Sequence, residues 1–431
     1  MRFSHGIIPK PLIQADDFCE NTRRIIGFFY SWEKNGEGKM LLSIALIFLL
    51  GMSFGKIFQK FGLPPLLGML LTGILLGPYM FNLLDTTILS ISAELRQMAL
   101  IIILVRAGLN LDIYDLKKVG RPAMLMCFVP ACFEILGILL LGPKLLGLSL
   151  LDAAILGTVI AAVSPAVIVP RMLKLMEEGY GTNKSIPQMI LAGASVDDVF
   201  VIVLFTAFTG LAQGGTIDMS QLVNIPIAII LGILVGIVVG LGLSQLFTKF
   251  HMRDTSKVIL ILSIAFLLVT LESWLEGVIG FSGLLAVMAL GATIHQLKVD
   301  VAARLSLKFS KMWSGAEVLL FVLVGALINV DYAINAGLVA IMIVLGSLIF
   351  RIIGVYISLL KTNLNSKEKI FTAIAYTPKA TVQAAIGGIP LAMGLASGEI
   401  VLTVAVISIV VTAPLGAILI DKTYHKLLVK D

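Results

Sequence analysis

Apolar segments follow one another along almost the whole chain from Met40 to Ile420, and this pattern constrains the fold more than any other feature. Each segment is roughly 18–25 residues long, which is enough for a helix to cross the hydrocarbon core of a bilayer. Short polar connections separate the segments, and none of them could hold a soluble domain. Charged residues make up 13% of the chain, whereas a soluble domain carries about 25%. The sequence therefore predicts an all-α membrane protein.

We predict about thirteen membrane-spanning helices, because a helix satisfies its own backbone polar groups in lipid. A separate amphipathic helix over Leu12–Trp32, in the tail 1–39, is too charged to span. It either lies in the membrane interface or packs against a second protomer. The predicted spans are 40–58, 64–83, 94–111, 121–142, 149–172, 185–211, 223–248, 256–276, 279–296, 310–329, 334–360, 367–391 and 397–420.

The short loops between these spans fall into two sets that differ in basic residues. One set, with the tail 421–431, holds about 21 Lys and Arg residues, and the other holds only Arg96 and Lys144. Basic residues concentrate in cytoplasmic loops, so we expect a plasma (bacterial inner) membrane protein with its N-terminus outside and its C-terminus in the cytoplasm. This placement attributes the net charge of +6 to membrane topology rather than to nucleic-acid binding.

Two of the predicted spans carry a proline in mid-membrane. Pro165 lies in the fifth span, and Thr377-Pro378 lies in the twelfth. Proline removes a backbone donor and breaks a helix, and seven intervening spans make these two helices antiparallel. Pro165 and Pro378 are 213 residues apart, and the residue 213 positions after Glu134 lies within one helical turn of Arg351. We therefore expect Glu134 and Arg351 to form a buried ion pair. Broken helices in matching positions of two inverted halves are the best sequence indication of a transport site.

Five charged residues lie deep inside the predicted helices: Glu134, Asp197, Asp198, Arg351 and Lys379. Each costs at least about 2.5–3.5 kcal/mol in the bilayer core, so such residues mark paired or functional sites. Asp197 and Asp198 are consecutive, and their side chains point about 100° apart on a helix. Repulsion in a low-dielectric site disfavours ionisation of both carboxylates at once. The pair therefore predicts a site where protons compete with a small hard cation.

Two further residues at the breaks are candidates for this site. Lys379 directly follows the second break, and we expect it to pair with Asp197 or Asp198 when no ion is bound. Alternatively, Lys379 is a fixed countercharge for the broken helix. The hydroxyl of Ser164 precedes the first break, where it either supplies an oxygen ligand or bonds to its own helix.

The acid pair in Gly193–Phe200, the proline-broken segments Ala161–Pro170 and Tyr376–Pro390, and the membrane lysine together resemble the monovalent cation:proton antiporters. The chain is most similar to the NHA-type sodium/proton exchangers and their bacterial relatives over residues 40–420. The resemblance implies an NhaA-like fold with two crossed discontinuous helices, and a homodimer. It also implies scaffold helices at 40–111 and 256–329, a linker helix at 223–248, and an ion-carrying core at 121–211 and 334–420.

The resemblance also assigns roles to the charged residues. It implies that Asp198 is the essential carrier of the cation and the proton, and that Asp197 pairs with Lys379. A buried Glu–Arg pair in the core corresponds to Glu134 and Arg351.

We therefore expect a secondary transporter, not an enzyme, that exchanges Na⁺ or Li⁺ for H⁺ by alternating access and needs no cofactor. The transported Na⁺ would bind at Asp197 and Asp198. K⁺/H⁺ exchange is the near alternative. A sodium-coupled symporter of an organic anion would need a roomy polar cavity. An intramembrane aspartyl protease would need its acids on separate helices, and here they are consecutive.

Overall fold

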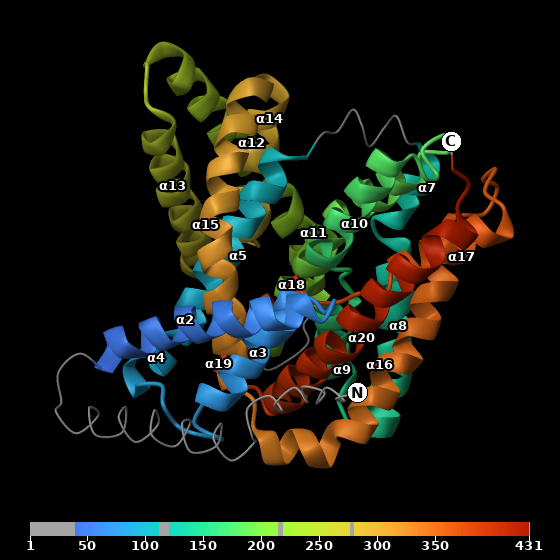
Figure 1. Cartoon of the computed structure of the whole chain (residues 1–431). Helices are drawn as coiled ribbons and strands as arrows, with labels where there is room; N and C mark the ends of the chain where they lie inside the picture. The colour runs from blue at the N-terminus through green and yellow to red at the C-terminus, as the bar shows by residue number, and fades with distance from the viewer. Residues whose placement is uncertain (1–38, 112–119, 214–218, 276–279, 431) are drawn as a thin grey trace, which may run out of the picture.

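The computed structural model describes residues 39–111, 120–213, 219–275 and 280–430 (Figure 1). Its regular elements in these ranges are helices, apart from one isolated β-bridge between Tyr180 and Lys430. The predicted amphipathic helix at Leu12–Trp32 lies outside the described residues. Nine helices of the described ranges are long and apolar enough to cross a membrane. Each of the thirteen predicted segments contains a helix, but thirteen crossings remain a prediction.

The helices pack in two groups. In the first group α2 packs on α3, α3 and α5 pack on α15, and α14 packs on both α5 and α12. Figure 1 shows α5, α12, α13, α14 and α15 standing side by side. The first group consists of α2 (Lys39–Lys60), α3 (Pro65–Leu76), α4 (Thr86–Ser90), α5 (Ser92–Leu109), α12 (Met219–Lys249), α13 (Asp254–Leu275), α14 (Gly283–Leu297) and α15 (Val299–Ala326).

In the second group α8 packs on α9 and α16, α9 packs on α11, and α20 packs on α16 and α17. Short α18 also contacts α5 and α15 of the first group, and it lies between the two groups in Figure 1. The second group consists of α7 (Arg121–Met126), α8 (Val129–Leu146), α9 (Leu150–Ala161), α10 (Pro165–Glu178), α11 (Ile186–Gln213), α16 (Val330–Ser358), α17 (Ser366–Ala375), α18 (Thr381–Ile386), α19 (Ile389–Ala392) and α20 (Gly398–Leu427).

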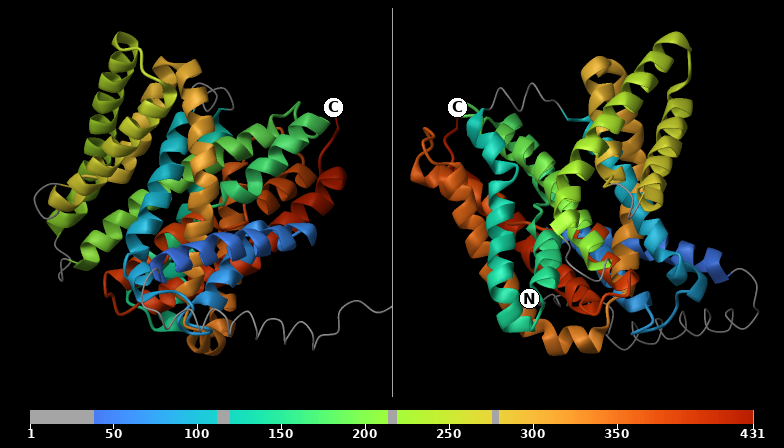
Figure 2. Two further views of the ribbon diagram at one scale, coloured as in Figure 1. Left: turned by 60° about the vertical axis from the view of Figure 1, so that its left-hand side comes forward. Right: turned by 180° about the vertical axis from the view of Figure 1, so that it is seen from behind.

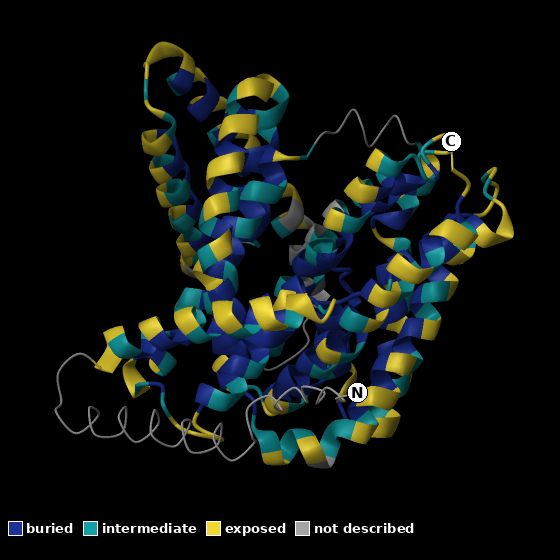
Figure 3. Ribbon diagram, viewed as in Figure 1, coloured by how far each residue is buried: buried dark blue, intermediate teal, exposed yellow. Residues whose placement is uncertain are grey.

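Large apolar side chains are exposed on the outward surfaces of both groups, for example Leu49, Ile259 and Leu338. Figure 3 shows buried positions in the interior and exposed ones along the outer faces of the helices, and the views in Figure 2 show the same helices from two other sides. Exposed apolar surface of this extent fits helices that face lipid rather than water.

Helix α15 begins at Val299, eleven residues before the start that the sequence predicted. Its first four turns carry Arg304, Lys308 and Lys311. Hydropathy alone does not identify a helix that continues out of the apolar region on charged residues. The predicted start is therefore too late for this helix.

Three glycines four residues apart, Gly232, Gly236 and Gly240, let α12 lie close to α14. A methyl group on Gly236 would collide with the backbone of Ala286, and one on Gly240 with the side chain of Thr293. Small residues at this spacing permit such an approach in membranes. The stripe thus packs α12 against α14 within the first group.

Candidate ion site at two interrupted helices

Two helices of the second group are interrupted, and the interruptions touch. Helix α9 ends at Ala161 and α10 begins at Pro165, while α17 ends at Ala375 and α18 begins at Thr381. Each gap contains or borders a proline, which cannot donate to the preceding turn. The Ser164 N–H donates a hydrogen bond of 2.8 Å to the Pro378 carbonyl. The sequence-predicted breaks therefore lie side by side in the structure.

The guanidinium of Arg351, from α16, connects both interruptions and is fully buried. Its Nε donates to the Tyr376 carbonyl at 2.6 Å, and its Nη1 donates to the Ala161 carbonyl. These carbonyls lie at the C-terminal ends of α17 and α9, where the helix dipole leaves partial negative charge. Arg351 therefore compensates two interrupted helices at once.

Asp197, from α11, is fixed by two donors to the same oxygen. Its Oδ2 accepts from the Val163 N–H at 2.9 Å and from Nη2 of Arg351 at 2.9 Å. Its side chain is fully buried, so the ion pair is shielded from water. These contacts orient Asp197 from one interrupted helix and from α16.

Glu134, from α8, bridges the two buried cations. Its Oε2 lies 2.8 Å from Nη1 of Arg351 and 2.8 Å from Nζ of Lys379. Ser347 donates to Oε1 of Glu134 at 3.1 Å. The structure thus contains the predicted Glu134–Arg351 ion pair. The expected Lys379–Asp197 contact is wrong for this structure, because Arg351 reaches Asp197 and leaves Lys379 to Glu134.

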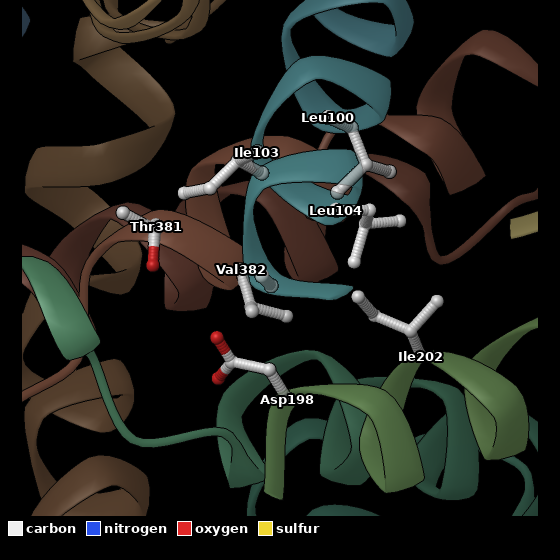
Figure 4. Close-up of a pocket in the computed structure, with 8 residues that line it drawn as sticks. Leu100, Ile103, Leu104, Asp198, Ile202, Thr381 and Val382 are labelled. Atoms are coloured by element: carbon white, nitrogen blue, oxygen red, sulfur yellow. The ribbon is translucent and has the colours of Figure 1, made fainter. Parts of the chain in front are cut away.

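Asp198, the next residue of α11, has a different environment. It lines a pocket between α5, α11 and α18, and its Oδ1 is buried with no hydrogen-bond partner in the described ranges. Figure 4 shows the carboxylate and the Thr381 hydroxyl directed into this space. The remaining pocket residues are apolar: Leu100, Ile103, Leu104, Ala107, Ile202 and Val382. Asp198 is therefore available for a ligand, whereas Asp197 is held.

Ser164 lies at the first break as predicted, and its Oγ is buried without a partner among the described residues. Thr377, in the second interruption, instead donates its hydroxyl to the Ile374 carbonyl of α17 at 2.8 Å. Sequence reasoning missed Ser347, Thr381 and Gln383. Polar side chains in the apolar stretch directly after Pro378-Lys379 were the available signal for the last two.

The charges of this cluster do not cancel. Three carboxylates (Glu134, Asp197 and Asp198) face two cations (Arg351 and Lys379), which leaves one negative charge when all five are ionised. Burial of an unpaired charge is costly. One monovalent cation or one proton at Asp198 would neutralise the cluster.

The family model described as "Sodium/hydrogen exchanger, transmembrane" matches residues 43–422, most of the chain. The chain belongs to this family of sodium/hydrogen exchangers. The predicted resemblance to monovalent cation:proton antiporters is thus confirmed.

Several individual proteins are also similar to this exchanger over most of its length. Mouse sodium/hydrogen exchanger 9B2 is 34% identical over 91% of this chain and 75% of its own length. Human sodium/hydrogen exchanger 9B2 is 34% identical over 99% of this chain and 82% of its own, and human 9B1 is 31% identical over 91% and 79%. The structure of the sodium proton antiporter MjNhaP1 from Methanocaldococcus jannaschii superposes with a TM-score of 0.79. At 20% identity over 90% of this chain and 99% of that one, this match shows a shared fold.

Proposed function

We propose that the exchanger carries Na⁺ or Li⁺ across the membrane in exchange for H⁺, with both competing for Asp198. The observation that carries this proposal is the pocket position of Asp198, whose Oδ1 is buried and has no hydrogen-bond partner among the described residues. It lies beside a buried ion-pair network, and the cluster has one more carboxylate than it has cations. A proton and a monovalent cation neutralise that charge equally well, but they cannot occupy the same carboxylate oxygen together. Loading one therefore expels the other.

The roles of the neighbouring residues follow from their contacts. Asp197, held by Arg351 and the Val163 N–H, orients the acid pair and adds negative potential to the bound cation. Ser164 has a free buried hydroxyl oxygen, which suits a cation that prefers oxygen ligands. Arg351 contacts Asp197, and Lys379 contacts Glu134, beside the carrier.

The pocket chemistry disfavours an organic anion as substrate. Its polar lining residues are an acid, Asp198, and a hydroxyl, Thr381, and the pocket has no basic lining residue to bind a carboxylate. K⁺ has the same charge and ligand preference as Na⁺, so K⁺/H⁺ exchange remains the alternative that a transport assay must separate.

Alternating access requires one part of the protein to move against another. We assign the moving core to the second group of helices, which holds both interruptions and the five charged residues of the ion site. We assign the scaffold to the first group without α12, and α12 is the linker helix between them. On this proposal the protein consists of two inverted halves. The interrupted helices α9–α10 and α17–α18 occupy matching positions in these halves and cross each other. The scaffold also forms a homodimer in the plasma membrane, with the N-terminus outside and the C-terminus in the cytoplasm.

Purified protein in proteoliposomes tests the transport proposal. Proton flux, read with a pH-sensitive dye, is driven by Na⁺, Li⁺ or K⁺ gradients. We expect Na⁺ and Li⁺ to drive exchange and the variant Asp198→Asn to reduce it to the level of empty liposomes. Asp254→Asn is the matched control, because Asp254 pairs with Arg304 at the start of α13. Wild-type exchange in the Asp198→Asn variant would refute Asp198 as the carrier.

A further inference from the structure

Five buried oxygens near the interruptions have no hydrogen-bond partner among the described residues. They belong to Ser164, Asp197, Asp198, Thr381 and Gln383. An unsatisfied buried acceptor costs free energy, so a cation bound near the interruptions would stabilise such oxygens. Gln383 differs from the others because its second polar atom reaches across to the other interrupted helix.

The Gln383 carboxamide contacts the first interruption. Its side chain is fully buried, and Nε2 donates to the Ala162 carbonyl at 2.9 Å. A carbonyl can only accept, so the amide nitrogen must face it, and the oxygen Oε1 must point elsewhere. The orientation of Gln383 is therefore set by Ala162.

The peptide that Gln383 contacts is the one that holds Asp197. The Ala162 carbonyl and the Val163 N–H belong to the same planar peptide unit. Gln383 binds the carbonyl end of this unit, and Asp197 Oδ2 binds the N–H end at 2.9 Å. Since the peptide is rigid, fixing one end fixes the direction of the other.

We propose that Gln383 is a positioning residue that sets the cation selectivity of the exchanger by holding the Ala162–Val163 peptide against Asp197. This inference rests on the proposed cation site at Asp198. A site with fixed spacing between its oxygens discriminates cations by size, and a loose one does not. Gln383 makes the spacing of the acid pair depend on both interrupted helices.

The test compares Na⁺ and K⁺ in Gln383→Leu and Gln383→Glu. Leucine keeps the approximate volume and loses the donor, so we expect the half-saturating Na⁺ concentration to rise about three- to tenfold, with K⁺ affected less. Glutamic acid donates to the Ala162 carbonyl only when protonated. The Gln383→Glu variant should therefore regain preference for Na⁺ as the pH falls.

Gln296→Leu is the matched control, because its Nε2 on α14 has no partner in the described ranges and its loss should leave selectivity unchanged. Unchanged Na⁺ preference in Gln383→Leu, or a lower maximal rate with unchanged preference, overturns the proposal.

Cation-dependent thermal stabilisation of the purified protein separates this inference from the transport proposal. A wild type that does not exchange Na⁺ for H⁺ refutes the transport proposal only. In that case, stronger stabilisation by NaCl than by KCl that is lost in Gln383→Leu supports the role of Gln383. Equal stabilisation ratios in the two proteins overturn it.

Discussion

Replacing Arg351 with methionine removes a side chain that binds both helix ends and two acids. Arg351→Met leaves Asp197 without a charged partner, whereas Glu134 keeps Lys379 and Ser347. Breaking a buried ion pair by removing one partner costs about 3–5 kcal/mol. Most of this cost should come from Asp197, because that is the charge left unpaired.

A second substitution shows which acid accounts for the lost free energy of unfolding. Adding Asp197→Asn to Arg351→Met removes the unpaired charge and should restore at least about half of the lost free energy of unfolding. Adding Glu134→Gln should lower stability further, because Lys379 then loses its partner as well. The two helix ends lose Arg351 in every variant, so their contribution cancels in the comparison.

Denaturant titration of the purified protein in detergent micelles, with each single variant included, measures these free energies. Equal rescue by Asp197→Asn and Glu134→Gln would refute the assignment of Arg351 to Asp197 and of Lys379 to Glu134. A loss below about 1 kcal/mol in Arg351→Met would contradict the buried ion pair itself.

Proton and Na⁺ fluxes should match one for one and be insensitive to a clamped membrane potential, because Lys379 is held by Glu134 and need not lose its proton when the carrier loads; potential-dependent exchange would contradict this. Gly193→Leu should destabilise the protein by about 1–3 kcal/mol in denaturant titration, since a side chain there displaces the Tyr376 hydroxyl. Gly236→Leu should likewise lower the thermal unfolding temperature by forcing α12 away from α14, and an unchanged temperature would rule out the close packing.

The sequence predicted the helical architecture because apolar length and proline position act locally along the chain. Pro165 and Pro378 interrupt their helices wherever those helices lie, so both breaks could be located before the structure. The charged residues of the site were equally visible, since a charge inside an apolar segment needs a partner.

Which charge pairs with which could not be predicted in the same way. Lys379 was expected to contact Asp197, and the structure gives that position to Arg351. A long guanidinium can bind two acids and two carbonyls together, and only the three-dimensional path of α16 determines which ones it reaches. The proposed role of Gln383 depends on its contact with the Ala162 carbonyl of another helix. The sequence around Gln383 does not indicate that contact.

Ser347 and Glu134 lie 213 residues apart and are in contact, and Pro165 and Pro378 have the same spacing. On the inverted-repeat proposal, Glu134 and Ser347 are two copies of one ancestral position, and Pro165 and Pro378 are two copies of another. Two copies related by a twofold axis can touch only where the axis passes between them. Glu134, which contacts both Arg351 and Lys379, would then lie at the twofold axis of the duplicated fold, with the Ser347 hydroxyl as its counterpart. A substitution of either residue would change the contacts of the other directly, so the two halves must evolve together at this point.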